Sequence, residues 1–245
     1  MKNLFCKLIG IMGIFTVCMP CSFSQTVAEK GNGHVITSER PVFAFEKIKS
    51  TGSVEVRFHA SAPCRATVTV DSNLDKYIEV SVEDGMLNIM NKNYGDSGNA
   101  FTKCTIDVYC PALTYVMIMG SGSFEVVDKV TSSTFEANIM GSGSINGKIE
   151  CNEFTATIYG SGSITATGTS KEATVSISGS GRFNGINFNA KNAAVSVGGS
   201  GQASISVADH LKATLFGEGS GGQITYRGNP KVEPNVSGNG RIVKM

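Results

Sequence analysis

Several features are scarce or absent in this chain. It has no tryptophan and only 3 histidines, and Asp, Glu, Lys and Arg together make up 17% of its 245 residues. Its net charge is +1, and without Lys2 and Lys7 of the leader it becomes −1. Proteins that bind nucleic acids or anionic membrane surfaces carry a basic patch or stripe, and none occurs here. We therefore expect neither of these as a partner.

Long hydrophobic runs are also missing, apart from one at the N-terminus. Lys2 and Lys7 precede the apolar run 8–19, and Ser22-Phe23-Ser24 forms a small-x-small cleavage site before Gln25. The run is too short to span a hydrocarbon core of ~30 Å. We therefore expect residues 1–24 to be a signal peptide, with no membrane span. The protein would be exported to the periplasm or the outer surface of a Gram-negative bacterium.

A lipid anchor is the alternative use of this leader. It would require Cys18 or Cys21 as the acylated residue, but Val17 and Pro20 precede them where a small residue is expected.

Cysteine is sparse once the leader is removed, because only Cys64, Cys104, Cys110 and Cys151 remain. In an exported protein these permit disulfides. Cys104 and Cys110 lie on one apparent strand, 102–109, about 20 Å apart, so they cannot pair with each other if it is straight. Cys64 could pair with either one, or the thiols could stay free and buried. With no Cys-x-x-Cys and scattered histidines, we expect no metal site and no cofactor.

Glycine, by contrast, is abundant and periodic. The motif Gly-x-Gly occurs seven times, and its starts are 21, 19, 19, 20, 20 and 19 residues apart. The glycines are Gly120, Gly122, Gly141, Gly143, Gly160, Gly162, Gly179, Gly181, Gly199, Gly201, Gly219, Gly221, Gly238 and Gly240. Such a period is typical of a stacked repeat in which each copy is one coil of a solenoid.

Apolar residues alternate with polar ones around each motif. Two residues before the first glycine stand Ile118, Ile139, Ile158, Ile177, Val197, Gly217 and Val236; four residues after it stand Phe124, Ile145, Ile164, Phe183, Ala203, Gln223 and Ile242. A period of two indicates strands, and no stretch sustains a helical period. If each strand runs straight through, both glycines face inward. Each glycine then permits either a corner with positive φ or a close approach of two walls.

The residue between the glycines is polar and predicted to face outward. It is Ser121, Ser142, Ser161, Ser180, Ser200, Ser220 and Asn239 in the successive copies. A row of hydroxyls could bind a linear repeating ligand, and Tyr159 with the methionines at 119 and 140 would add an apolar strip. The simpler interpretation is that serine is small and soluble next to glycine. Gly179–Gly185 resembles a nucleotide-binding fingerprint, but the sister copies open no helix, so we reject that function.

The N-terminal half alternates without the glycine motif. Residues 42–111 form a β region that we expect to cap one end of the solenoid of residues 112–245, after a polar lead-in at 25–41. Phe43-Ala44-Phe45 is predicted as its first strand, and Asp84-Gly85 predicts a hairpin. Residues 91–100 read as a loop. The expected fold is all-β: a β-helix-like solenoid of Gly-Ser-Gly coils behind an alternating-strand region.

These residues resemble a known family. The alternating first half, Cys110-Pro111-Ala112-Leu113 before the first motif, the serial coils and Ile224–Pro230 are similar to the domain of unknown function 2807, also called the putative auto-transporter adhesin head GIN domain. The match spans about residues 42–229. The resemblance implies an all-β envelope protein of Bacteroidetes-like bacteria with no established activity.

Three functions follow as hypotheses. The leading one is a noncatalytic envelope protein, an adhesin that binds a glycan or a surface protein. The second is a self-assembling scaffold, of unknown oligomeric state. The third is a polysaccharide-active enzyme using Glu153 and Glu172, which share a repeat position, although Lys191 in the next coil favours a solvated ladder. We therefore predict no catalytic residue.

Overall fold

A computed structural model describes residues 29–92, 100–217 and 221–245. The predicted signal peptide lies outside these residues, as does most of the predicted loop at 91–100. The described residues form β-strands with a single 3-10 turn, η1 (Asp75–Tyr77), and no α-helix. The all-β prediction is confirmed.

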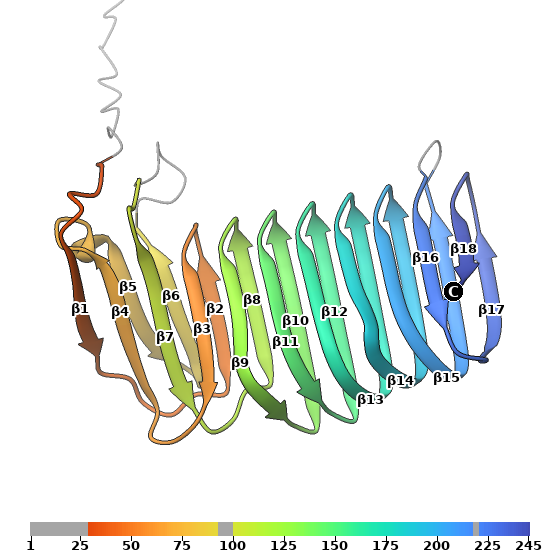
Figure 1. Cartoon of the computed structure of the whole chain (residues 1–245), viewed down its shortest axis with the longest axis horizontal. Coiled ribbons are helices and arrows are strands. Elements are labelled where there is room, and N and C mark those ends of the chain that lie inside the picture. The colour runs from red at the N-terminus through yellow and green to blue at the C-terminus, as the bar shows by residue number, and fades with distance from the viewer. Residues whose placement is uncertain (1–28, 93–99, 218–220) are drawn as a thin grey trace, which may run out of the picture.

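The strands follow one another around a flattened solenoid (Figure 1). In chain order they are β1 (Val35–Arg40), β2 (Lys47–Thr51), β3 (Glu55–Ala60), β4 (Arg65–Asp71), β5 (Ile78–Glu83), β6 (Met86–Asn91), β7 (Cys104–Cys110), β8 (Tyr115–Gly120), β9 (Ser123–Thr131), β10 (Thr134–Gly141), β11 (Ser144–Glu150), β12 (Glu153–Gly160), β13 (Ser163–Gly179), β14 (Arg182–Gly199), β15 (Gln202–Phe216), β16 (Gln223–Arg227), β17 (Lys231–Val236) and β18 (Arg241–Lys244).

Each coil crosses the molecule twice. In one coil β10 runs up one wall, Gly141-Ser142-Gly143 turns the corner, and β11 returns along the other wall. β10 pairs in parallel with β8 and β12, while β11 pairs in parallel with β9 and β13. Equivalent residues stack, as in Ile118, Ile139 and Ile158. The predicted solenoid of stacked coils is therefore present.

The N-terminal half continues these walls in a different chain order. β2 pairs with both β6 and β8, and β3 pairs with both β7 and β9. The β2–β3 coil therefore lies between the β6–β7 coil and the β8–β9 coil. At this end β5 joins β6, β4 joins β7 and β1 joins β4, all antiparallel. These three strands form a cap smaller than the expected one at 42–111, because antiparallel pairing ends the stack of parallel coils only at β1, β4 and β5.

Two local predictions in this half had different outcomes. The hairpin at Asp84-Gly85 is present between β5 and β6, with φ of 48° and 72° at its two turn residues. The strand predicted at Phe43-Ala44-Phe45 is wrong, because this segment connects β1 to β2. Phe43 is 83% exposed while Phe45 is buried. The strand lies earlier instead, since β1 occupies part of the predicted polar lead-in.

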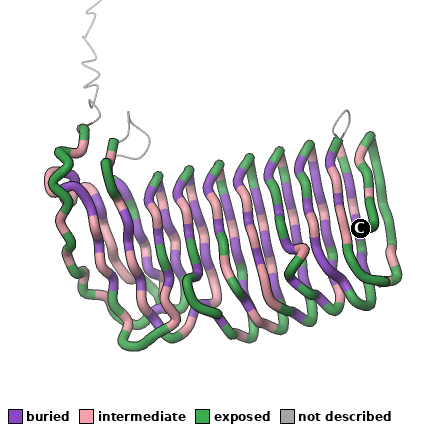
Figure 2. The backbone as a smooth tube through the Cα atoms, in the orientation of Figure 1, coloured by how far each residue is buried: buried purple, intermediate pink, exposed green. Residues whose placement is uncertain are grey.

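The core is a narrow apolar layer between the walls. Buried and exposed residues alternate along the strands (Figure 2). Phe135 and Phe154 stack from coil to coil on one wall, with ring centroids 6.4 Å apart, and Phe183 packs against Phe154 from the opposite wall at 6.0 Å. Because each coil buries its side chains against its neighbours, packing depends on the stack rather than on any one coil.

The glycine motif lies at a break between two strands, so the condition of one straight strand is not met. β8, β10 and β12 end at the first glycine of their motifs, and the next strand begins at the residue after the second glycine. The motif is therefore the corner between the two walls, which places its serine at the edge of the molecule.

Candidate functional site

The first glycine of each motif makes the bend. Gly120, Gly141, Gly160, Gly179 and Gly199 have φ between 95° and 133°, a region that L-residues rarely adopt. A Cβ on Gly141 would also lie 2.5 Å from the carbonyl oxygen of Gly120 in the previous coil. Both the conformation and the stacking therefore require glycine here.

The second glycine faces inward. A Cβ on Gly143 would lie 2.6 Å from the carbonyl oxygen of Gly122 and 2.8 Å from the Cγ2 atom of Ile118. Gly162 and Gly181 meet the isoleucines of β10 and β12 in the same way. The two glycines of one motif therefore have different roles. The first permits the corner, and the second permits close packing of the corner against the previous coil.

The sixth motif departs from this register. The corner positions are taken by Gly217, with φ 127°, and Gly222, not by Gly219 and Gly221. Gly221 is exposed, and a Cβ there would have no atom within 4 Å. Leu215 pairs with Val197, and Ile224 pairs with Ala203. The chain has extra residues at this corner, so Ile224 takes the inward position predicted for Gln223. Gly219 and Ser220 lie outside the described residues.

The corner serines form a continuous exposed row, which we call the serine row. Amide N–H groups of Ser142, Ser161 and Ser180 donate to the carbonyls of Gly120, Gly141 and Gly160, at 2.9 to 3.0 Å. These bonds hold consecutive serines in register at a spacing of about 4.8 Å. Ser121 and Ser200 extend the row, and all five are exposed. Within the described residues, no protein group hydrogen-bonds to their hydroxyls, so these remain open to a ligand.

Sequence reasoning missed one member of the row. Gly52 has a φ of 110°, and its amide donates to the carbonyl of Met119 at 2.9 Å, so the β2–β3 coil turns the same corner. Its exposed Ser53 therefore precedes Ser121 in the stack. The signal was the dipeptide Gly52-Ser53, which lacks the second glycine because Val54 stands there. With Ser53, the serine row comprises Ser53, Ser121, Ser142, Ser161, Ser180 and Ser200.

An apolar strip runs beside the serine row, on the wall that contains β8, β10 and β12. Met119, Met140 and Tyr159 are direct neighbours across these strands. Met140 is 45% exposed and Tyr159 is 55% exposed, so the strip is accessible. The next position is Ser178, and beyond it Phe216 lies over Gly198. Hydroxyls and an aromatic face therefore lie side by side along the middle coils.

Glu153 and Glu172 begin a stacked row of residues, which we call the acidic row, and the residue that follows them differs from the prediction. Glu153 and Glu172 are stacked, as predicted. The next residue in the row is Asn192, not Lys191, because the pairing of β13 with β14 shifts register between Thr165 and Thr167. Asn192 donates to Glu172 at 2.7 Å, and His210 follows it.

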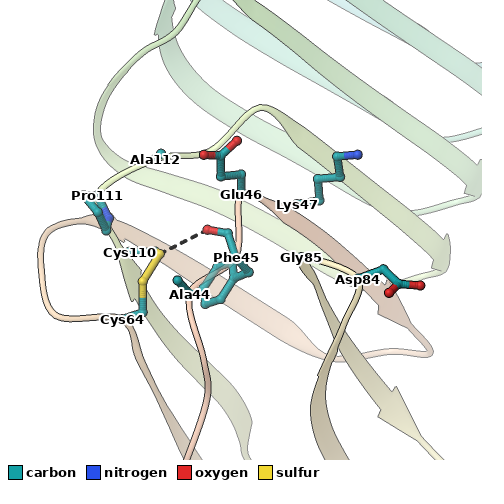
Figure 3. Close-up of a pocket in the computed structure, with 10 residues that line it drawn as sticks. All are labelled: Ala44, Phe45, Glu46, Lys47, Cys64, Asp84, Gly85, Cys110, Pro111 and Ala112. Carbon is teal, nitrogen blue, oxygen red and sulfur yellow. Dashed lines mark hydrogen bonds between the residues drawn. A yellow bond between two sulfur atoms is a disulfide. The ribbon is translucent and has the colours of Figure 1, made fainter.

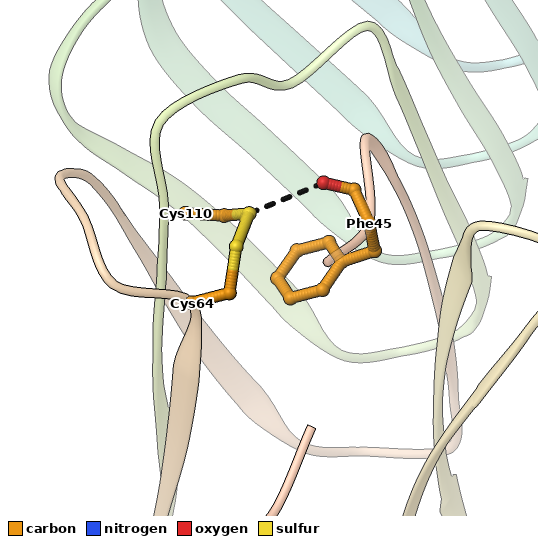
Figure 4. The surroundings of a disulfide bond; sticks show 3 residues. All are labelled: Phe45, Cys64 and Cys110. Atoms are coloured by element: carbon orange, nitrogen blue, oxygen red, sulfur yellow. Dashed lines mark hydrogen bonds between the residues drawn. A yellow bond between two sulfur atoms is a disulfide. The ribbon is translucent and has the colours of Figure 1, made fainter. Parts of the chain in front are cut away.

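Of the four cysteines, the structure joins Cys64 to Cys110. The pairing follows from the antiparallel register, in which Arg65 lies opposite Tyr109 and so brings the two cysteines together. The carbonyl oxygen of Phe45 lies 3.2 Å from Cys110 Sγ (Figure 4). Because a disulfide sulfur carries no hydrogen, this is a close S···O contact.

Cys104 and Cys151 are free thiols. Burial, with a smaller effect of Asp71 and Glu55, raises the pKa of Cys104 to about 12. Burial raises the pKa of Cys151 to about 11. Since the thiolate is the reactive form, neither residue is an activated nucleophile at neutral pH.

An apolar pocket of about 420 Å³ lies beside the disulfide (Figure 3). Ala44, Phe45, the disulfide and the Pro111-Ala112 turn form its apolar lining. Glu46, Lys47 and Asp84 are exposed charged residues that also line it. We call it the disulfide pocket. Its volume is within the range of small-molecule sites.

The described residues contain neither a candidate metal site nor a candidate membrane-spanning helix. No group of three His, Cys, Asp or Glu side chains there is arranged to hold a metal ion. None of the helical segments in that part of the chain is long and apolar enough to cross a bilayer.

The comparisons with known proteins agree with this architecture. The sequence profile of the family described as "Putative auto-transporter adhesin, head GIN domain" matches residues 44–230. No curated protein matches the chain significantly.

Several solved structures share the fold. A putative adhesin from Bacteroides fragilis is 21% identical, with a TM-score of 0.82 over 88% of this chain and 99% of that one. A putative lipid binding protein from Parabacteroides distasonis is 25% identical, with a TM-score of 0.75 over 89% of this chain and 100% of that one. A putative adhesin from Parabacteroides merdae is 24% identical, with a TM-score of 0.69 over 88% of this chain and 98% of that one.

Proposed function

Because this chain belongs to the family described as putative auto-transporter adhesin, head GIN domain, we propose that it is a noncatalytic, exported cell-envelope protein that binds a linear glycan along its serine row. The leader at residues 1–24 and the Bacteroides and Parabacteroides sources of similar structures support an envelope location. The family name and the neighbours named as adhesins support binding as the role.

The observation that carries the proposal is the match between the serine row and a repeating ligand. The hydroxyls recur every ~4.8 Å in one straight line, a spacing similar to the length of one sugar ring in an extended chain. Each hydroxyl can both donate and accept a hydrogen bond. Tyr159 and Met140 supply an apolar surface beside them, against which the C–H face of a sugar can pack.

The test uses two hydroxyl pairs on the same two coils. In Ser161→Ala/Ser180→Ala, two members of the serine row are lost; adding Ser142→Ala removes a third. The matched control is Thr155→Ala/Thr174→Ala, which removes two in-register hydroxyls from β12 and β13 on one wall, away from the corner. We expect the serine variants to lose retention on a glycan array and the control to keep it. Equal binding by all variants would show that the serine row is not the glycan-binding surface.

The acidic row does not favour catalysis. Glycoside hydrolysis needs two carboxylates that flank a bound sugar. Glu153 and Glu172 are both exposed, and the side chain of Asn192 donates a hydrogen bond to Glu172. We expect purified protein to release no products from a panel of polysaccharides. Depolymerisation that is lost in Glu153→Gln would show that the protein is an enzyme.

A second function is favoured by the disulfide pocket. Its apolar lining and volume suit one acyl chain, and one similar structure is named as a putative lipid binding protein. We expect Ala112→Trp, which fills the pocket mouth, to abolish binding of a fluorescent fatty acid. Equal binding of the fatty acid by the wild type and this variant would show that the disulfide pocket is not the binding site.

Self-assembly through the last coil is opposed by its edge strands. β17 carries Pro234, which has no N–H to donate, and β18 carries Arg241 and Lys244. Proline and charge are the usual means of blocking edge-to-edge pairing. We therefore expect a monomer in sedimentation velocity at all concentrations, and growth of higher species with concentration would support the scaffold function.

A further inference from the structure

A polar hollow of about 380 Å³ lies at the end of the serine row nearest the cap. Ser53, Ser121 and Ser123 line one side, and the segment Phe101–Thr105 lines the other, with Glu55 and Arg57 from β3 between them. The first two members of the serine row thus lead into this hollow. A glycan that follows the row would place its end residue here.

The segment that closes the hollow is held from behind by a buried carboxylate. Asp71 is fully buried and accepts hydrogen bonds from the amides of Thr102, at 2.8 Å, and Lys103, at 3.4 Å. The hydroxyl of Thr102 and the amide of Gly33 also donate to it, at 2.5 and 2.9 Å. These bonds fix the backbone from which Phe101 and Lys103 project, so the hollow is pre-formed.

The charges of the hollow leave one cation without a partner. Arg57 lies 2.7 Å from Glu55 and 4.0 Å from Glu125, so its charge is compensated. Thr105 donates its hydroxyl to Glu55 at 3.3 Å. Lys103 is exposed and forms no ion pair with any described residue. An anionic group on a ligand would therefore meet Lys103.

The hollow also contains an aromatic ring and a neutral thiol. Phe101 is half-buried, which leaves part of its ring accessible to a ligand. Cys104 stays protonated because burial raises its pKa to about 12, so it adds no negative charge. A ring, several hydroxyls and one unpaired cation are the groups that a carboxylated sugar can use together.

From this arrangement we propose that the hollow is a terminal subsite for a sugar that bears a carboxylate, such as a uronic acid. The proposal rests on glycan binding by the serine row and names the class of sugar at its end. The sugar ring packs on Phe101, its hydroxyls bond to Ser121 and Ser123, and its carboxylate pairs with the ammonium group of Lys103.

The test compares tetragalacturonate with its fully methylated ester, which keeps the sugar chain and removes the charge. Isothermal titration calorimetry on the mature chain should show tighter binding of the acid than of the ester. Lys103→Gln should weaken acid binding by about tenfold, because a charge-assisted hydrogen bond is lost, and leave ester binding within about twofold. Phe101→Leu should weaken both ligands by a similar factor, since it removes only the ring.

Lys148→Gln is the matched control, because Lys148 is an exposed cation on the same wall, in β11, outside the hollow. It should leave both affinities unchanged, and circular dichroism should show that every variant is folded. Equal affinity of the wild type for acid and ester, no binding of the acid, or an unchanged preference in Lys103→Gln would overturn the proposal. The serine variants could lose glycan retention while Lys103→Gln still prefers the acid over the ester. This result would rule out the terminal subsite but support glycan binding by the serine row.

Discussion

At the scale of single residues, the structure divides positions that look identical in sequence. Both glycines of a motif were predicted to be structural, but in the second to fifth motifs only the first has a positive φ, and only the second packs against an isoleucine of the coil before it. The described serines between them, Ser121, Ser142, Ser161, Ser180 and Ser200, are exposed, and their hydroxyls form no hydrogen bond with the described residues. The division follows from the corner, which the alternating pattern alone does not reveal.

Replacing a corner glycine tests this division. Gly141→Ala should destabilise the protein by about 3 kcal/mol, because strain at positive φ adds to overlap with Gly120. Gly143→Ala should cost about 1 to 3 kcal/mol through overpacking alone. Urea denaturation provides the measurement.

Gly221→Ala is the control for both replacements, since an added Cβ there meets nothing. We expect its stability to equal that of the wild type to within about 0.5 kcal/mol. A loss as large as that of Gly141→Ala would mean that the sixth corner keeps the sequence register after all.

Asp71 provides a second residue-scale prediction. Four hydrogen bonds, of which that from the Thr102 hydroxyl has the largest effect, lower its pKa below the ordinary 3.8. The carboxylate therefore contributes stability that is complete above the pKa of the unfolded chain and is lost as pH falls through the lower folded-state pKa. Asp71→Asn should be less stable than the wild type at pH 7.

The difference between the two proteins should shrink as the pH is lowered below 3.8, because protonated aspartic acid no longer has its advantage over asparagine. Thermal unfolding across this range provides the measurement. A difference that stays constant with pH would show that the charge of Asp71 plays no part.

At the scale of elements, the strands follow from alternation but their order in space does not. Val56 and Phe58 alternate with polar residues in the sequence, and both are buried on β3 of the β2–β3 coil. Nothing in the alternation shows that this coil inserts between β6–β7 and β8–β9, because all of these strands have similar patterns and pairing depends on contacts distant in sequence. The strand predicted at Phe43-Ala44-Phe45 is wrong because the composition of this segment is typical of a strand although Phe43 is exposed.

The disulfide between Cys64 and Cys110, 46 residues apart, ties the start of the cap strand β4 to the end of β7 in the neighbouring coil. Removing it with Cys64→Ser/Cys110→Ser should destabilise the protein by about 2 to 4 kcal/mol, since the unfolded chain gains freedom. The melting temperature should also fall on reduction of the wild type. The Cys151→Ser variant should show the same fall in melting temperature on reduction as the wild type. An unchanged melting temperature in the double variant would contradict the pairing of Cys64 with Cys110.

At the scale of the whole molecule, the glycine period predicted the stacked coils, and the structure confirms them. The candidate site was predicted less completely: Ser53 joins the serine row without a full motif, and His210 enters the acidic row only because of a shift in register. The polar hollow was not predicted at all. Its residues come from three separate stretches of the chain, which only the inserted coil brings together.

A stack of similar coils predicts tolerance to removal of one whole coil. Deleting residues 142–160 joins Gly141 to Ser161 and restores a complete corner, with β13 stacking on β10 in the register that β12 had. We expect a folded protein with a slightly lower melting temperature. Deleting residues 142–151 instead removes about half a coil and should abolish folding, because every later strand would move to the opposite wall.

Binding by the whole-coil deletion is the most direct test of the claim that the serine row is the binding surface. Calorimetry would compare the wild type with this variant, using oligosaccharides of increasing length from the glycan that the wild type retains. The account predicts that affinity stops rising at a shorter oligosaccharide in the deletion variant, with equal affinity of both proteins for the shortest one. Identical dependence on length in both proteins would contradict it.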